Sequence, residues 1–118
     1  MANTIQSSSF HILIFNDENY DFWSTKMKTY FRFQDLWDIV ERGFTIPSDT
    51  TVLTDAQTKE KNENEQKDVK ALFVLQQAMT IAIFPRIKGA TTTKEAWATL
   101  QEEFQGSDKV RAIKLQTL

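Results

Sequence analysis

The first amphipathic stretch of the chain is rich in aromatic side chains. Its apolar positions recur every three or four residues, which places them on one stripe of an α-helix that begins near residue 20. Asp17 or Asn19 is placed to cap this helix, because a side-chain oxygen can accept hydrogen bonds from unpaired amides of the first turn. The stripe consists of Tyr20, Trp23, Met27, Tyr30 and Phe31.

A shorter amphipathic stretch follows and predicts a second helix. Gly43 stands at its end, where helices commonly need left-handed backbone geometry. Pro47 then lies in a cluster of Ser, Asp and Thr that is typical of a loop. The apolar face of this short helix is formed by Leu36, Trp37 and Val40.

A long segment, residues 55–84, has a polar half followed by an apolar half. Thr54 and Gln57 have the spacing of a capping box, which predicts the start of a helix. The polar half mixes acidic and basic residues with almost no apolar face, so we expect it to be solvated or frayed. The apolar half is predicted to be the central core helix, ending at Phe84 because Pro85 follows. Its apolar residues are Leu72, Leu75 and Met79 on one face and Phe73, Val74, Ile81 and Ile83 on others.

The last part of the chain predicts two more helices. Thr92 and Glu95 repeat the capping-box spacing, and Gly106 ends the stripe that follows. Ser107 is placed to cap a final helix, which the chain leaves without a termination signal. The two stripes are Ala96, Trp97, Leu100 and Phe104, and then Val110, Ile113 and Leu118.

These patterns predict an all-α fold, a small bundle of about five to six helices with roughly 60–70% of its residues helical, well above the usual share. Residues 1–15 are expected to form a flexible tail and an apolar arm, and residues 16–118 the helical domain, truncated within its last helix. The candidate core residues are Tyr20, Trp23, Met27, Leu36, Trp37, Val40, Leu72, Leu75, Trp97, Leu100 and Phe104. The candidate interface residues are Phe10, Ile12 and Ile14 in the arm and Val110, Ile113 and Leu118 in the last helix.

Composition narrows the function. The 118 residues suit one domain, and a net charge of -2 gives no basic field to attract nucleic acid or anionic lipid. The chain has no cysteine, which excludes disulfides, thiolate metal sites and cysteine nucleophiles. It carries neither a signal-peptide pattern nor an apolar run long enough to cross a bilayer. We therefore expect a cytoplasmic protein that has no membrane partner.

Residues that carry chemistry are scarce. His11 is the only histidine, and no serine or cysteine motif accompanies it. The three glycines, at positions 43, 89 and 106, are too far apart for a phosphate loop or a dinucleotide fingerprint. The aromatic residues lie on amphipathic helices, which favours core packing over base stacking. We expect no enzyme activity, no catalytic residues, no metal and no cofactor.

The order of several sequence blocks resembles a known family. The blocks "FNDENYDFWSTKMKTYF", "LWDIV", "KALFVLQQA", "IFPRI" and "ATTTKEAWATLQEEFQG" are similar to the N-terminal, capsid-type region of the Gag polyprotein of plant copia-type LTR retrotransposons. The resemblance spans nearly the whole chain. One departure is Asp17 or its neighbour, where the family commonly has glycine, so the turn before the first helix is expected to be more constrained here.

The resemblance implies an all-helical fragment that multimerises into the shell that packages element RNA. It implies RNA binding only through downstream regions of full-length Gag. Because the last helix stops short, we expect a homodimer through Val110, Ile113 and Leu118, with the arm packing on its own domain or on a neighbour.

Two other interpretations stay open. One is a domesticated, Gag-derived host adaptor that binds a protein or peptide in a groove between helices. The other is a nucleic-acid-binding module, for which Lys109, Arg111 and Lys114 near the end of the chain would contribute a basic face.

Overall fold

The computed structural model describes residues 13–45 and 52–105. Of these residues 68% are helical and none forms a strand, which confirms the all-α class. Four α-helices lie in the described ranges, fewer than the expected five to six. The expected loop around Pro47, the helix after Ser107 and the interface residues Phe10, Ile12, Val110, Ile113 and Leu118 lie outside the described residues.

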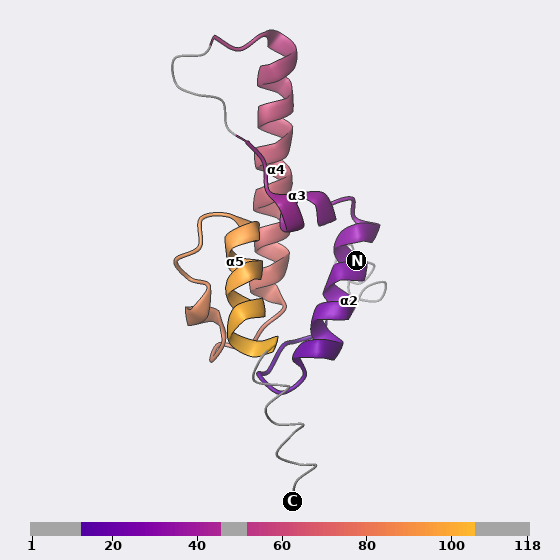
Figure 1. The fold of residues 1–118 in the computed structure, drawn as a ribbon, viewed down its shortest axis with the longest axis vertical. Helices are drawn as coiled ribbons and strands as arrows, with labels where there is room; N and C mark the ends of the chain where they lie inside the picture. The colour runs from indigo at the N-terminus through magenta and orange to yellow at the C-terminus, as the bar shows by residue number, and fades with distance from the viewer. Residues whose placement is uncertain (1–12, 46–51, 106–118) are drawn as a thin grey trace, which may run out of the picture.

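One long helix organises the domain. The elements are α2 (Tyr20–Phe33), α3 (Trp37–Arg42), α4 (Asp55–Gln77), the 3-10 turn η1 (Phe84–Arg86), α5 (Thr93–Leu100) and the π-helical turn η2 (Gln101–Gln105). Figure 1 shows α2 and α5 on either side of the second half of α4, with α3 crossing above them. The first half of α4 projects beyond the other helices, and none of its residues up to Lys67 is buried.

The predicted start of α2 is confirmed, but its cap differs from the expectation. Asn19 is the N-cap residue, yet its side chain makes no capping hydrogen bond. Its Oδ1 instead accepts the backbone N–H of Asn16 at 3.3 Å, which closes the preceding turn. In that turn Asp17 has φ 81°, in the left-handed region that favours glycine. A non-glycine residue in this conformation fits the expectation of a more constrained turn before α2.

The C-terminal end of α3 and the starts of α4 and α5 lie where the sequence predicted them. Gly43 ends α3 with φ 71°. Thr54 and Gln57 form the complete capping box, with bonds of 2.9 and 3.1 Å. At α5, Thr92 accepts the N–H of Glu95 at 3.2 Å, but the Glu95 side chain accepts from Thr91 N–H rather than from Thr92. The second capping box is therefore only half formed.

The predicted end of the central helix at Phe84 is wrong, because α4 ends at Gln77. Phe15 pairs there with Met79 in an isolated parallel bridge. Phe15 N–H donates to the carbonyl of Ala78 at 2.8 Å, and Phe15 C=O accepts from Thr80 N–H at 3.1 Å. The backbone groups of Ala78 and Thr80 could have continued α4, but they form hydrogen bonds with Phe15 instead. The residues that follow therefore form turns.

Two apolar residues that were expected to fill faces of the core helix are exposed instead. Ile81 lies in the turn after α4 and is 91% exposed, whereas Phe73, still within α4, is 60% exposed. Ile83 and Met79 are buried although they lie outside the helix. The apolar half of the long segment therefore contributes to the core from both a helix and a turn.

Aromatic rings form the centre of the core. Phe15 is fully buried and stacks on Trp23 with ring centroids 4.8 Å apart, and Phe104 meets Phe15 edge to face at 4.9 Å. The Trp23 indole N–H is buried without a hydrogen-bond partner, so this ring acts through packing alone. Of the candidate core residues, Trp37 and Leu72 are half-buried; the buried ones are Tyr20, Trp23, Met27, Leu36, Val40, Leu75, Trp97, Leu100 and Phe104.

Candidate binding groove

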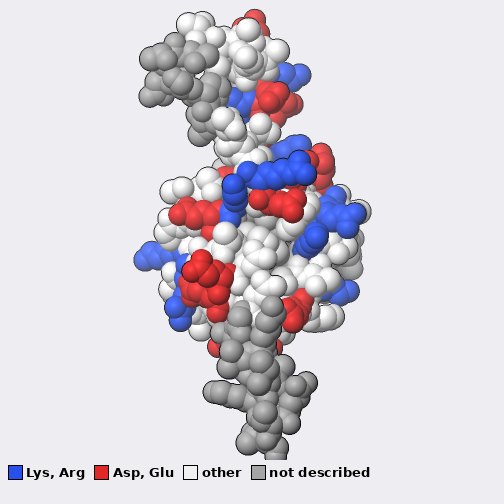
Figure 2. Space-filling model, in the orientation of Figure 1, with Lys and Arg blue, Asp and Glu red and all other residues white. Residues whose placement is uncertain are grey.

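A groove of about 340 Å³ opens between α2, α3 and the α5–η2 helix. Figure 2 shows a largely uncharged surface between α5 and α2, bordered by side chains of both signs. The groove is lined by Tyr20, Ser24, Thr25, Lys28, Trp37, Val40, Glu41, Lys94, Trp97, Ala98, Gln101 and Gln105.

Two tryptophans connect the groove to the core. Trp97 is buried and meets Trp37 edge to face, with centroids 5.6 Å apart. On its other side Trp97 stacks on Trp23 at 5.8 Å. Because Trp37 is only half-buried, the aromatic cluster continues from the interior to the groove surface.

Two lysines stand at the groove. The Lys28 ammonium lies 5.2 Å from the centre of the Trp37 ring, within cation–π range. Lys94 packs its stem against Gly43, since a Cβ built on Gly43 would lie 3.1 Å from Lys94 Cδ. Glu41 is the acidic residue of the lining, so the groove carries an excess of positive charge.

A buried polar clamp sets the position of α5 against α4. Asp68 is 6% exposed, and its Oδ1 accepts the N–H of Thr93, the first residue of α5, at 3.0 Å. The Thr93 hydroxyl donates in return to the carbonyl of Asp68 at 2.8 Å. The sequence interpretation missed Asp68. Its signal was an acidic residue in the helical register of Ala71 and Leu75, both buried.

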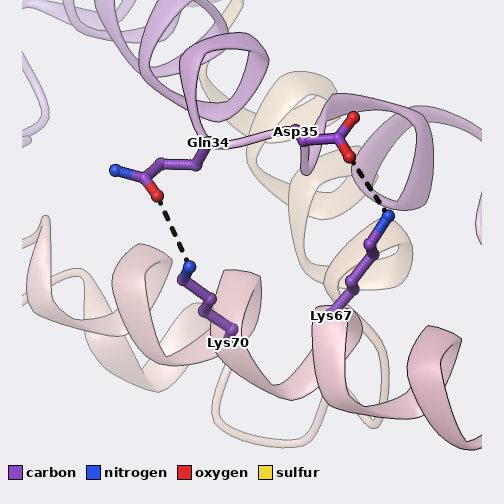
Figure 3. Close-up of polar contacts among 4 residues, drawn as sticks. All are labelled: Gln34, Asp35, Lys67 and Lys70. Carbon is purple, nitrogen blue, oxygen red and sulfur yellow. Dashed lines mark hydrogen bonds and ion pairs between the residues drawn. The ribbon is translucent and has the colours of Figure 1, made fainter.

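A second, exposed set of polar contacts joins the α2–α3 turn to α4. Figure 3 shows Lys67 reaching Asp35 and Lys70 reaching Gln34. The Lys67 Nζ lies 3.3 Å from Asp35 Oδ2, and the Lys70 Nζ lies 3.4 Å from Gln34 Oε1. Asp35 itself has φ 61°, the left-handed geometry of the turn between the two helices. These contacts and the Asp68 clamp hold α3 and α5, two walls of the groove, on one helix.

Other kinds of site receive no support from residues 13–45 and 52–105. This part of the chain holds no group of three or more metal-ligating side chains. None of its helices has both the length and the apolar character needed to cross a membrane. Of the candidate interface residues in the arm, Ile14 is described and is 44% exposed.

The comparison with protein families adds the deciding observation. A family model described as the gag-polypeptide of LTR copia-type matches residues 27–118. The chain belongs to this Gag family. The match begins inside α2 and covers α3, α4, α5 and the groove residues from Lys28 onward. No curated protein and no solved structure matches the chain. Membership in the copia-type Gag family supports a structural, Gag-like role for this protein.

Proposed function

We propose that this chain is a self-assembling, non-catalytic domain of a copia-type Gag that contributes to a capsid shell. The observation that carries the proposal is the family match over residues 27–118. In this role the domain associates with further copies of itself, and packaging of element RNA falls to downstream regions of full-length Gag. The net charge of -2 supports that division, because an acidic domain gains little from the phosphate backbone.

Exposed apolar surface on the described helices supports self-association. Val69 and Phe73 lie one turn apart on α4 and are 62% and 60% exposed. They lie on a different helix from the groove-lining residues. Together with Val110, Ile113 and Leu118 in the last part of the sequence, they are the surfaces we assign to contacts between copies.

Sedimentation velocity of paired variants tests which surface is used. Ile113→Asp should abolish a dimer formed through the last segment while leaving helix content nearly unchanged by circular dichroism. Phe73→Asp should likewise abolish a dimer formed through the α4 surface. Asn62→Asp, at an exposed neutral residue on the projecting part of α4, is a control for one added negative charge. The proposal fails if neither apolar variant changes the sedimentation of the wild-type protein.

RNA binding separates this proposal from a nucleic-acid-binding module. The isolated chain should bind single-stranded RNA weakly and without sequence preference in a filter-binding assay at physiological salt. Tight, sequence-selective binding would contradict the role assigned here and would favour a basic face built from Lys109, Arg111 and Lys114.

A further inference from the structure

We propose that the groove between α2, α3 and α5 binds a short, extended peptide from a partner protein, in which acidic residues flank an aromatic residue. The groove lining does not include Val69 or Phe73, the described apolar residues assigned to self-association. The existence of this site does not depend on whether the domain assembles.

The groove can receive one large side chain of an occupant. Its volume is about 340 Å³, and it is open to solvent, so the residues on either side of that side chain would lie along its rim.

The lining matches the two parts of such a peptide. Trp37 and Trp97 give an aromatic floor whose edge-to-face geometry an incoming ring can extend. The walls carry hydroxyl and amide groups, from Ser24, Gln101 and Gln105, that can both donate and accept hydrogen bonds. An extended peptide needs such partners because its backbone N–H and C=O groups are unpaired, whereas a helix satisfies its own.

Charge selects the flanking residues of the peptide. Lys28 and Lys94 outnumber Glu41 in the lining, and Lys28 is held above the Trp37 ring. A ring seated on Trp37 therefore brings its sequence neighbours close to an ammonium group. A carboxylate at one of those neighbouring positions can accept a charge-assisted hydrogen bond from the ammonium group. A lysine at the same position would be repelled by it.

The charge of the groove also makes the chain's own final segment a poor occupant. Residues 106–118 follow directly after Gln105, a lining residue, but they hold Lys109, Arg111 and Lys114 against the single acid Asp108. A basic segment does not complement a groove with excess positive charge. The charge of this segment therefore favours an occupant from another protein over residues 106–118.

Fluorescence anisotropy with two labelled peptides tests the proposal on the full chain. The acidic probe is Ser-Glu-Phe-Glu-Ser-Gly, and the matched probe replaces both glutamates by lysine. We expect saturable, micromolar binding of the acidic probe and binding of the lysine probe weaker by about tenfold or more. Trp37 lies at the site, so intrinsic tryptophan fluorescence should change on the same titration.

Two variants alter the groove, and each has a matched control. Ala98→Trp fills the groove, and Lys28→Glu combined with Lys94→Glu reverses its charge. Ala82→Trp, and Lys26→Glu combined with Lys88→Glu, make the same changes at exposed residues outside the lining. We expect both groove variants to weaken binding of the acidic probe by about tenfold and both controls to leave it within about twofold. Circular dichroism verifies the fold, and the charge variant alone suffices if the tryptophan variant does not fold.

Three results would overturn the proposal. They are the absence of saturable binding to the wild-type protein, equal binding of the two probes, and undiminished binding to the groove variants. If the first result is accompanied by loss of self-association in Ala98→Trp, the groove belongs to contacts between copies. Unchanged self-association in a variant that no longer binds peptide supports two separate sites.

Discussion

Replacing Asp68 by alanine removes the acceptor that joins α4 to the first turn of α5. In the wild-type protein the carboxylate holds the N–H of Thr93 at 3.0 Å, and Thr93 is fully buried. The substitution leaves that N–H in the interior without its partner. The hydroxyl of Thr93 keeps its own bond, because its acceptor is the backbone carbonyl of residue 68.

The expected loss follows from these contacts. A buried donor left without an acceptor costs about 1–3 kcal/mol. Removing a carboxylate from the N-terminal end of a helix costs about 0.3–1 kcal/mol more. We expect Asp68→Ala to lower the free energy of unfolding by about 2–3 kcal/mol, which for a domain of this size lowers Tm by roughly 10–20 °C. Asp68→Asn retains an oxygen acceptor and should cost less than about 1 kcal/mol.

Urea denaturation followed by tryptophan fluorescence and by circular dichroism measures these differences. Glu63→Ala, an exposed acidic residue on the same helix, controls for the loss of a carboxylate and should change stability by less than about 0.5 kcal/mol. A stability loss for Asp68→Ala as small as that of the control would contradict the role assigned to the Asp68 carboxylate. A loss for Asp68→Asn as large as that for Asp68→Ala would show that the charge of Asp68, rather than its hydrogen bond to Thr93, dominates.

Three further predictions concern helix ends and the core. Thr54→Ala removes half of the capping box, worth about 1 kcal/mol, from a projecting helix end, so hydrogen exchange should accelerate in the first turns of α4 while Tm barely changes. A large loss of global stability would contradict this. Asp35→Val forces a β-branched residue into φ 61° and should lower the free energy of unfolding, measured by urea denaturation, by roughly 1–2 kcal/mol. Lys67→Ala should cost less, because it removes only an exposed ion pair worth less than about 1 kcal/mol. The reverse order would show that the ion pair matters more than the backbone conformation. Trp23→Ala should lower the free energy of unfolding, measured by thermal denaturation, by about 3–5 kcal/mol, and Trp37→Ala should lower it clearly less, because Trp23 is fully buried and Trp37 half-buried. Equal losses would mean that side-chain exposure does not predict these stability changes.

Local signals predicted local structure well. The capping box of Thr54 and Gln57 places both partners three residues apart, so the sequence alone located the start of α4. Gly43 marked the end of α3 for the same reason, because a left-handed backbone conformation is a property of one residue. The aromatic stripe of α2 follows from helical periodicity alone.

Structure that depends on distant partners was not predictable in this way. The early end of α4 arises from the bridge between Phe15 and Met79, and no local pattern near Gln77 signals it. The groove has the same origin, since Trp37 and Trp97 come from separate helices that meet only in the folded domain. Asp68 gave a readable signal, an acidic residue on an apolar face, but its partner Thr93 lies on another helix.

The claim that this Gag domain associates with itself is tested most directly by sedimentation equilibrium of the wild-type chain across a concentration series. We expect an average mass that rises from 13.7 kDa towards twice that value or beyond as concentration increases. A mass that stays at 13.7 kDa up to hundreds of micromolar would contradict it.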